Sequence, residues 1–284
     1  MKQIITTISL FACLATLLVS CDKIPQEEYV VFSGAAGQWF DGTGVNDHSQ
    51  RALIEKYTGV RCMNCPNADI AIAAATEQYN GQLIAVAIHD SSTFTRPIGD
   101  TPRLSTDDGD AWSKFFGVFA AGEYPTALIN RSTNGSGWDL FTPTSGINGR
   151  ADDIISQQAQ VAIAVDANAG DKITINVNLE FLQNISDQLT VTLFIMEDQL
   201  QVTQRQPDGS DDNNYIHNHV LRDVITDIWG ADIDCTGQTG EKRVAQFIYD
   251  NYNKDWNLHN CHIVAFISNK ESRQILNVAE CEIQ

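Results

Sequence analysis

The chain has 284 residues, of which 18 are basic and 36 acidic, giving a formal net charge of −18, and 43% are hydrophobic. This composition is that of a globular protein with enough chain for one large or two ordinary domains, and we expect two. The acidic excess argues against binding to nucleic acid and against attachment to an anionic lipid surface by charge, since both carry phosphate groups that it repels.

The N-terminus predicts an exported protein. A lysine at position 2 precedes the apolar run "IITTISLFACLATLLVS", and Cys21 follows at once. The run is too short for a comfortable membrane span, so residues 1–20 are interpreted as a signal peptide. The tripeptide Leu18–Ser20 resembles the lipobox of bacterial lipoproteins, in which the following cysteine is acylated, for example with palmitate. The alternative is an ordinary secretory signal with a chance cysteine.

Residues 21–48 are rich in Gly, Gln, Asp and Asn and are predicted to be a tether. An alternation of strands and helices follows. "RALIEKYT" is typical of a strand, the alanine-rich "CPNADIAIAAATEQYNG" of a helix, and "QLIAVAIH" of a buried parallel strand. Together they predict one βαβ unit with a right-handed crossover.

Further elements complete this region. "AWSKFFGVF" predicts a short helix, Pro125 precedes a strand over residues 126–131, "GSGWDLF" suggests a hairpin partner, and "GRADDIISQQAQ" predicts a closing helix. The order β, α, β, α, β, β, α over residues 49–160 is that of a thioredoxin-like α/β domain.

After residue 160 the apolar period changes to two. Seven runs show it, namely "VAIAVDA", "KITINVNLEFL", "QLTVTLFIMED", "YIHNHVLRDVI", "RVAQFIYD", "HNCHIVAFIS" and "QILNVAECEI". Seven antiparallel strands separated by turn-rich segments predict an all-β, immunoglobulin-like β-sandwich over residues 161–284.

The cysteine pair carries the main functional signal. Cys62 and Cys65 stand three residues apart, after a predicted strand and at the start of a predicted helix. Unpaired backbone N–H groups and the helix dipole favour a thiolate there, which makes Cys62 a candidate nucleophile and Cys65 the resolving thiol. Arg61 should favour the thiolate further.

Three other residues are candidates to support that pair. In thioredoxin-like proteins a proline in the place of Pro125 is cis and packs against the cysteines, and the residue before it, here Tyr124, docks the substrate strand. Glu55 is a candidate for a buried acid that relays protons, although strand alternation leaves open whether Glu55 or Lys56 points inward.

Other roles for the cysteines stay open. In an oxidising compartment two cysteines at this spacing close into a disulfide whatever their function, so the pair could be a structural brace. Zinc would need a second ligand pair in the same domain; His217 and His219 belong to the other domain, and we expect neither a metal nor a cofactor. Cys261 and Cys281 lie on two runs joined by a short turn and could form a cross-strand disulfide, and Cys235 could pair with either.

The stretches "EKYTGVRCMNCPNA", "VAIHD", "YPTALINR", "IHNHVLRDV" and "WNLHNCHIVAFISNKESRQILNVAE", together with the lipoprotein signal, are similar to the outer-membrane-protein-twenty-eight-related family of Gram-negative lipoproteins. The resemblance covers nearly all of the mature chain. It implies a thioredoxin-like domain followed by a β-sandwich, tethered to the outer membrane by lipid, with Cys62 and Cys65 as the family's cysteine pair and Pro125 as its cis-proline.

Two hypotheses follow. In the first, a lipid-anchored envelope protein exchanges thiols and disulfides with substrate proteins, Cys62 attacking and Cys65 resolving. In the second, the protein is a non-enzymatic surface lipoprotein that binds an envelope or host protein, and the cysteine pair is a permanent disulfide. No Ser-His-Asp order, phosphate-binding glycine loop or metalloprotease helix is present, so we expect neither a hydrolase nor a kinase.

Overall fold

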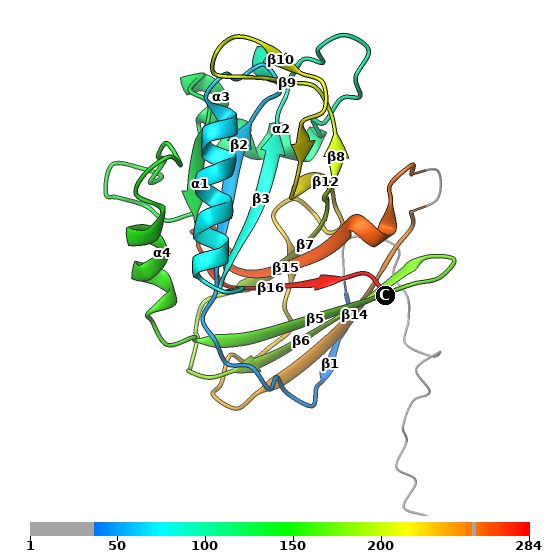
Figure 1. Cartoon of the computed structure of the whole chain (residues 1–284). Helices are drawn as coiled ribbons and strands as arrows, with labels where there is room; N and C mark the ends of the chain where they lie inside the picture. Colours follow the sequence, from blue (N-terminus) through cyan, green and yellow to red (C-terminus); the bar gives the residue numbers. More distant parts are fainter. Residues whose placement is uncertain (1–36, 252–253) are drawn as a thin grey trace, which may run out of the picture. The chain divides into compact units, whose positions relative to one another are not determined.

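Residues 37–251 and 254–284 are described by a computed structural model in which β-sheet predominates and a few helices lie against it (Figure 1). The predicted signal peptide, the predicted acylation at Cys21 and the first part of the predicted tether lie outside these residues. No helix in the described ranges is long and apolar enough to span a bilayer.

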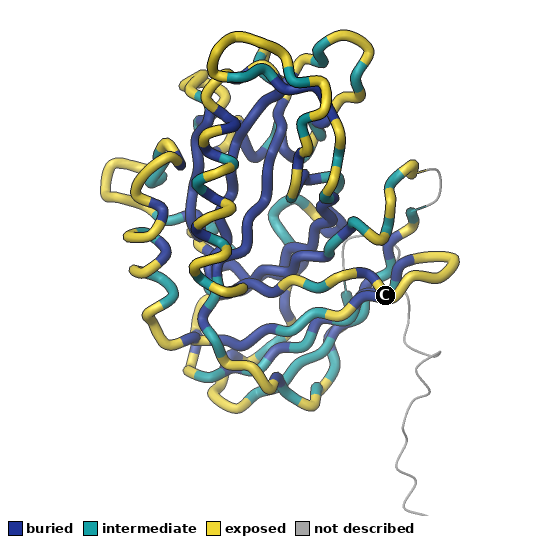
Figure 2. Tube along the Cα trace, in the orientation of Figure 1, coloured by how far each residue is buried: buried dark blue, intermediate teal, exposed yellow. Residues whose placement is uncertain are grey.

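The predicted strand, helix and strand are all present. They are β2 (Ala52–Thr58), α1 (Cys65–Gln78) and β3 (Leu83–His89). The strands pair in parallel along their whole length, and every residue of both is buried (Figure 2). Helix α1 has Pro66 in its first turn, where a missing N–H costs nothing, and it packs onto the sheet through Ile72 and Ala75.

The next elements differ from the prediction in detail. They are η2 (Thr93–Thr95), α2 (Asp107–Phe115), α3 (Val118–Ala121), β4 (Thr126–Ile129) and α4 (Ile147–Ile155). The single helix predicted over residues 111–119 is two helices, because Gly117 takes a left-handed conformation between them. Helix α2 begins earlier than predicted, at a cap in which the Thr106 hydroxyl accepts from the Gly109 N–H. "GSGWDLF" contributes only the isolated bridges of Trp138 and Phe141.

The seven predicted C-terminal runs all contain strands. These are β5 (Val161–Ala169), β6 (Ile173–Phe181), β7 (Leu189–Glu197), β11 (Ile216–His217) with β12 (Val220–Val224), β14 (Lys242–Tyr249), β15 (Cys261–Asn269) and β16 (Ile275–Glu282). The sequence patterns missed the short strands β1 (Trp39–Asp41), β8 (Leu200–Gln201), β9 (Gln204–Arg205), β10 (Asp211–Asp212) and β13 (Ala231–Asp232), and the short helix η3 (Leu258–Asn260).

Two sheets hold most of the strands. One has four strands in the order β1-β14-β6-β5, and the other has the order β16-β15-β7-β12-β3-β2-β4 with β13 added on β7. Strands from both predicted domains therefore lie in one sheet, joined where Ala87 of β3 pairs in parallel with Val220 of β12. The predicted boundary near residue 160 falls between α4 and β5, and the division into two domains at that point stays a prediction.

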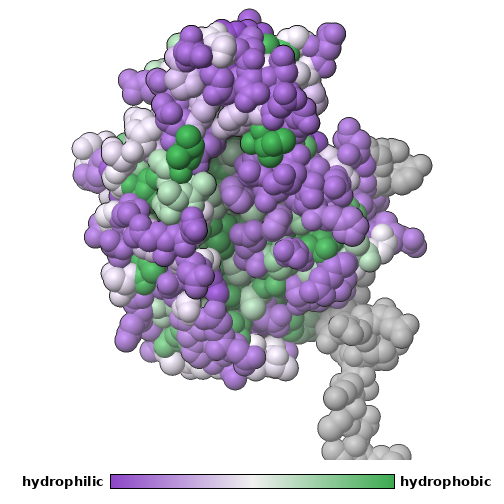
Figure 3. Space-filling model, in the orientation of Figure 1, coloured by the Kyte–Doolittle hydropathy of each residue, from purple (hydrophilic) through white to green (hydrophobic). Residues whose placement is uncertain are grey.

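The buried residues form separate clusters on the two faces of the larger sheet. The largest cluster fills the space between the two sheets. A second lies between the larger sheet and α2, and a third between the same sheet and helices α1 and α4. The face seen in Figure 3 is mostly hydrophilic, with small apolar patches scattered over it and in its recesses.

The predicted tether over residues 21–48 ends too late. Residues 39–41 form β1, which pairs antiparallel with β14, and Trp39 is buried in the core between the sheets with its indole N–H donated to the Asp232 carbonyl at 3.0 Å. The buried Val45, whose N–H donates to Glu180 at 3.0 Å, is a second attachment of this segment to the sheet.

Candidate functional site

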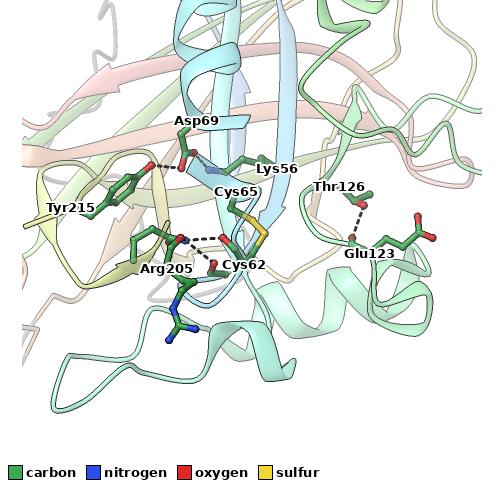
Figure 4. The surroundings of a disulfide bond; sticks show 10 residues. Lys56, Cys62, Cys65, Asp69, Glu123, Thr126, Arg205 and Tyr215 are labelled. Carbon is green, nitrogen blue, oxygen red and sulfur yellow. Dashed lines mark hydrogen bonds and ion pairs between the residues drawn. A yellow bond between two sulfur atoms is a disulfide. The ribbon is translucent and has the colours of Figure 1, made fainter. Parts of the chain in front are cut away.

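Cys62 and Cys65 form a disulfide at the start of α1, as predicted (Figure 4). Their Cα atoms are 5.4 Å apart, within the usual range for a disulfide. The Cys62 N–H donates to the Gly59 carbonyl at 3.0 Å, and the Cys65 N–H to the Cys62 carbonyl at 3.3 Å. The chain therefore makes a tight turn between β2 and α1, and Cys65 is the first helical residue.

The disulfide opens onto a groove on the surface. This groove has a volume of about 730 Å³ and is open to solvent, and its lining includes Cys62, Met63, Phe94, Tyr124 and Pro125. The Tyr124–Pro125 peptide bond is cis, as the thioredoxin-like interpretation predicted. Only 2% of the surface of Cys62 is exposed, so a reaction partner has to enter the groove to reach its sulfur.

The side chain of Tyr124 is fixed by a hydrogen bond of its hydroxyl. Its hydroxyl donates to the Asp90 carboxylate, which also accepts from the Ser113 hydroxyl at 2.5 Å. Burial and the neighbouring Asp90 carboxylate raise the pKa of Tyr124 well above its usual value. The phenol is thus a neutral anchor that holds the Tyr124–Pro125 segment against the wall of the groove.

Arg61 also lines the groove, but its side chain has other partners. The guanidinium donates to the Arg96 carbonyl at 2.9 Å and to the Pro97 carbonyl at 2.6 Å. These two bonds connect the cysteine turn to the loop after β3. That the Arg61 charge also favours a Cys62 thiolate stays a prediction.

The structure settles which of Glu55 and Lys56 faces the cysteine helix. Glu55 lies on the opposite face of β2, where its carboxylate pairs with Arg131 at 2.8 Å, and both side chains are 1% exposed. The Arg131 guanidinium also stacks on three aromatic rings, those of Trp112, Phe116 and Phe266. Glu55 is therefore engaged in a structural ion pair, away from α1.

Lys56 points toward α1 instead and forms an ion pair with Asp69, one helical turn after Cys65 (Figure 4). The side chain of Lys56 is 7% exposed, and burial lowers its pKa to about 7, against the attraction of Asp69, which favours the ammonium form. Tyr215 completes the arrangement, because its hydroxyl donates to the second oxygen of Asp69 at 2.7 Å.

Two histidines lie close to this ion pair. His89 and His217 are 1% and 7% exposed, and their rings meet edge to face with centroids 5.9 Å apart. Burial, and then the charge of Lys56, lowers the pKa of His217 to about 4, and burial lowers the pKa of His89 well below its usual value. Neither ring nitrogen of His89 has a hydrogen-bond partner among the described residues. Both rings are therefore neutral at pH 7.

Gln204 holds the cysteine turn from the other side. Its side-chain amide is 1% exposed and donates to the Cys62 carbonyl at 3.0 Å and to the Gly59 carbonyl at 3.4 Å. Sequence reasoning missed Gln204 and Tyr215, and it considered His217 only as a metal ligand. A buried glutamine within a polar, turn-rich segment gives no periodic signal, so only the tertiary structure reveals it.

The other cysteines are free among the described residues. The suggested Cys261–Cys281 disulfide is not formed, because Cys281 stands opposite Ile263 and Cys261 is two residues away on the neighbouring strand. Such a diagonal pair is too far apart to bridge. Cys235 is likewise unpaired, and burial raises the pKa of all three thiols.

His217 and His219, the two histidines weighed as metal ligands, lie in different backbone surroundings. β11 ends at His217, and His219 has a left-handed backbone and approaches Asp198 at 3.3 Å. Among the described residues there is no group of three or more side chains that could hold a metal ion.

Comparison with known proteins identifies relatives of this chain. A family model described as outer membrane protein Omp28 matches residues 111–284. HBP35 of Porphyromonas gingivalis has a similar structure, with a TM-score of 0.62 and 16% identity over 84% of this chain and 76% of that one. A protein of Agrobacterium tumefaciens matches with a TM-score of 0.54 and 18% identity, over 84% of this chain and 98% of its own. At such identities the likeness concerns the fold alone.

A domain of the outer membrane lipoprotein Omp28 from Porphyromonas gingivalis also matches, with a TM-score of 0.31 and 21% identity, over 44% of this chain and 89% of its own. No curated protein matches the sequence.

Proposed function

The chain belongs to the Omp28 family of outer membrane proteins, and we propose that it is a lipid-anchored envelope protein that exchanges thiols and disulfides through Cys62 and Cys65. The cysteine pair lies outside the matched residues 111–284, so the chemistry is argued from the site and not from the family. The observation that carries it is the disulfide at the first turn of α1, sharing one groove with the cis Tyr124–Pro125 bond.

The proposed fold has two parts. Residues 49–160 are a thioredoxin-like part, supported by the parallel β2-α1-β3 unit, the antiparallel β4 and the cis Pro125 that precedes it. Residues 161–284 are an immunoglobulin-like sandwich, supported by two largely antiparallel sheets with a common apolar core. The two parts share the larger sheet.

The proposed exchange is reversible and balanced. With the pair reduced, the Cys62 thiolate attacks one sulfur of a substrate disulfide, and the other substrate sulfur leaves as a thiolate. Cys65 then attacks the Cys62 sulfur, closing the Cys62–Cys65 disulfide and releasing the second substrate thiolate. The substrate gains two electrons, and the protein loses two. A dithiol protein of the envelope returns the pair to its reduced state by the reverse steps.

The groove suits an extended protein segment as the substrate. Its lining is mostly apolar or neutral and includes Phe94, Met63, Asn67 and Thr144, and the exposed Met63 stands beside Cys62. This lining can accept an uncharged peptide segment of a substrate protein. The net charge of −18 disfavours strongly anionic partners. Substrate proteins carrying disulfides, or dithiols in the reverse direction, are therefore the proposed partners.

A redox titration of the purified full chain tests this function. Glutathione and dithiothreitol buffers set the potential, and mass spectrometry of alkylated Cys62 and Cys65 reports the oxidised fraction. We expect a midpoint between about −120 and −270 mV, with Cys62 of the reduced protein alkylated faster than an ordinary thiol at neutral pH. A midpoint below about −300 mV would leave the pair as a structural disulfide in a binding lipoprotein, which is the alternative function.

Three variants sharpen the result. In C65S the resolving thiol is missing, so a mixed disulfide between Cys62 and a substrate should accumulate. The matched control is C281S, which removes a half-buried free thiol on β16 and should leave the midpoint unchanged. An equal yield of mixed disulfide from C62S and C65S would contradict the assignment of Cys62 as the attacking residue.

Membrane attachment is proposed to depend on acylation of Cys21, with the bilayer as the partner of the acylated N-terminus. A C21A variant expressed with its signal should leave the membrane fraction, because the net charge of −18 offers no electrostatic attachment to replace the acyl chains. Membrane fractionation with an antibody to the chain measures this, and an unchanged membrane fraction would contradict the anchor.

A further inference from the structure

The hairpin formed by residues 200–217 comes from the C-terminal part of the chain but lies against the cysteine pair. Its strands pair as β8 with β11 and β9 with β10. At one point the Arg205 N–H donates to the Val60 carbonyl at 2.8 Å, and Val202 packs with Val60 in a small apolar cluster. The hairpin thus attaches to the turn that precedes Cys62, more than 140 residues earlier.

The hairpin forms hydrogen bonds both to the turn of Cys62 and to helix α1. Gln204, on β9, donates from its buried amide to the Cys62 carbonyl at 3.0 Å. Tyr215, just before β11, donates to Asp69 at 2.7 Å, and Asp69 stands on α1 one turn after Cys65. Figure 4 shows the carboxylate of Asp69 between the Tyr215 hydroxyl and the Lys56 ammonium, beside Cys65.

We propose that this hairpin controls the redox properties of the cysteine pair by positioning its surroundings. Gln204 is the positioning residue for the turn of Cys62, and Tyr215 is the positioning residue for the Lys56–Asp69 pair. The inference rests on the proposed thiol–disulfide exchange and adds to it residues from the other half of the chain. Neither residue contacts a sulfur in the contacts described, so neither is assigned a catalytic role.

Gln204 should act on the equilibrium between dithiol and disulfide. The amide holds the Cys62 carbonyl while the disulfide is closed, and under this proposal it keeps that bond when the pair is reduced, so that the turn stays in the conformation in which the disulfide can close again. Without the amide the reduced turn gains conformational freedom, and closure costs more entropy. The Gln204→Leu variant should therefore be reduced more readily, by about threefold or more in the equilibrium constant with glutathione.

Tyr215 should act on the charge beside the pair. The groups facing Lys56 are Asp69 from α1, His217 from the hairpin and His89 from β3. The Tyr215 hydroxyl holds Asp69 at the Lys56 ammonium, and Asp69 stands one helical turn after Cys65, so the charge of this ammonium should favour a thiolate of the cysteine pair. In Tyr215→Phe the carboxylate is less well held, the ammonium is less favoured, and alkylation of Cys62 near neutral pH should slow by about threefold.

The test compares three full-chain variants with the wild type. Tyr215→Phe and Gln204→Leu are measured for the glutathione equilibrium constant and for the pH profile of Cys62 alkylation. Tyr249→Phe is the matched control, because the Tyr249 hydroxyl also donates to a carboxylate, that of Asp223 at 2.5 Å, outside the cysteine site. Tyr249→Phe should leave both measurements unchanged.

The outcomes separate the two proposals. The hairpin has no role at the site if Tyr215→Phe shows the same pH profile of Cys62 alkylation as the wild type and Gln204→Leu shows the same glutathione equilibrium constant. This holds even where the wild type behaves as an oxidoreductase. If the wild type has a midpoint below about −300 mV, the exchange function is wrong. Even with such a low midpoint, the glutathione equilibrium constant and the alkylation profile of the reduced variants show whether the hairpin influences the redox behaviour of Cys62 and Cys65. Should Gln204→Leu fail to fold, Tyr215→Phe decides alone.

Discussion

Glu55 and Arg131 form a buried ion pair in which each partner depends on the other. Both partners are 1% exposed, so removing one leaves the other as an unpaired buried charge. We predict that Arg131→Met lowers the free energy of unfolding by about 3–5 kcal/mol, and that the added substitution Glu55→Leu recovers much of the loss. Urea unfolding at neutral pH measures both changes.

A solvent-exposed ion pair is the control for that prediction. Lys114 and Asp110 pair at 2.5 Å on α2, and the Lys114 side chain is 55% exposed. Lys114→Met should cost less than about 1 kcal/mol, because water and salt screen such a pair. Similar losses for Arg131→Met and Lys114→Met would show that burial does not set the cost.

The buried histidines predict how stability depends on pH. Burial holds the pKa of His217 at about 4, below its ordinary value of 6.5, and that of His89 also well below 6.5. Below pH 6.5 the unfolded chain binds more protons at these two sites than the folded protein does. The free energy of unfolding should therefore fall as the pH drops from 6.5 toward 4, by about 1.4 kcal/mol per pH unit for each histidine.

His262 opposes this trend, because the hydrogen bond that its ring donates to the Glu280 carboxylate raises its pKa, and its contribution to stability is gained as the pH falls. His89→Leu should remove part of the net slope, since one of the two buried imidazoles is gone. Urea unfolding at about pH 7.5 and about pH 5.5 measures the slope. The assignment of the slope to the buried histidines would be contradicted by a wild type that is equally stable at the two pH values. It would also be contradicted if the stability of His89→Leu depended on pH as strongly as that of the wild type.

At the same scale, the sequence shows why Glu55 and Lys56 could not be told apart. Period-two alternation says that they face opposite sides of β2, but all seven residues of that strand are buried. A strand with both faces covered gives no polar side by which to orient it. The partners that decide the question, Arg131 and Asp69, are 76 and 13 residues away, and only the folded chain brings them there.

Among the elements, β1 tests the difference between a tether and a structural strand. Trp39 is 6% exposed and lies in the core between the two sheets. Trp39→Ala should therefore cost about 3–5 kcal/mol, because it leaves a cavity and removes the bond to the Asp232 carbonyl. Gln38→Ala is the control, since Gln38 is exposed and should change stability by less than about 0.5 kcal/mol. Equal stability of the two variants would mean that β1 is dispensable.

Length and local pattern explain which elements could be predicted. Strands of seven to nine residues, such as β2, β6 and β15, show enough period-two or apolar signal to be found, and α1 shows a helical period. Strands β8 to β10 have two residues each and stand in a polar, turn-rich segment, which indicates a loop. That segment nevertheless supplies Gln204, and the predicted run that begins at Tyr215 gives no sign of its bond to Asp69, so the predicted site lacked the hairpin that holds it.

At the scale of the whole molecule, the two halves are joined by buried polar side chains as well as by a common sheet. Asn277 on β16 is fully buried and donates to the Val161 carbonyl at 2.9 Å, while its amide oxygen accepts from the Arg51 N–H at 3.0 Å. Asn130 donates to the Ile275 carbonyl at 3.1 Å and accepts from the Leu53 N–H at 2.7 Å. A split between the halves would break the Arg51–Asn277 and Asn130–Ile275 bonds and leave these groups without their partners.

We therefore predict a single cooperative unfolding transition for the full chain, because separating residues 49–160 from residues 161–284 would open the β3–β12 pairing and uncover the apolar residues between them. Calorimetry measures this as a calorimetric enthalpy equal to the van't Hoff enthalpy. Fragments 49–160 and 161–284 expressed separately should be largely unfolded by circular dichroism. Two resolved transitions, or a folded fragment 49–160 with the midpoint potential of the full chain, would instead establish two independent domains, and the cysteine site would then need nothing from the hairpin.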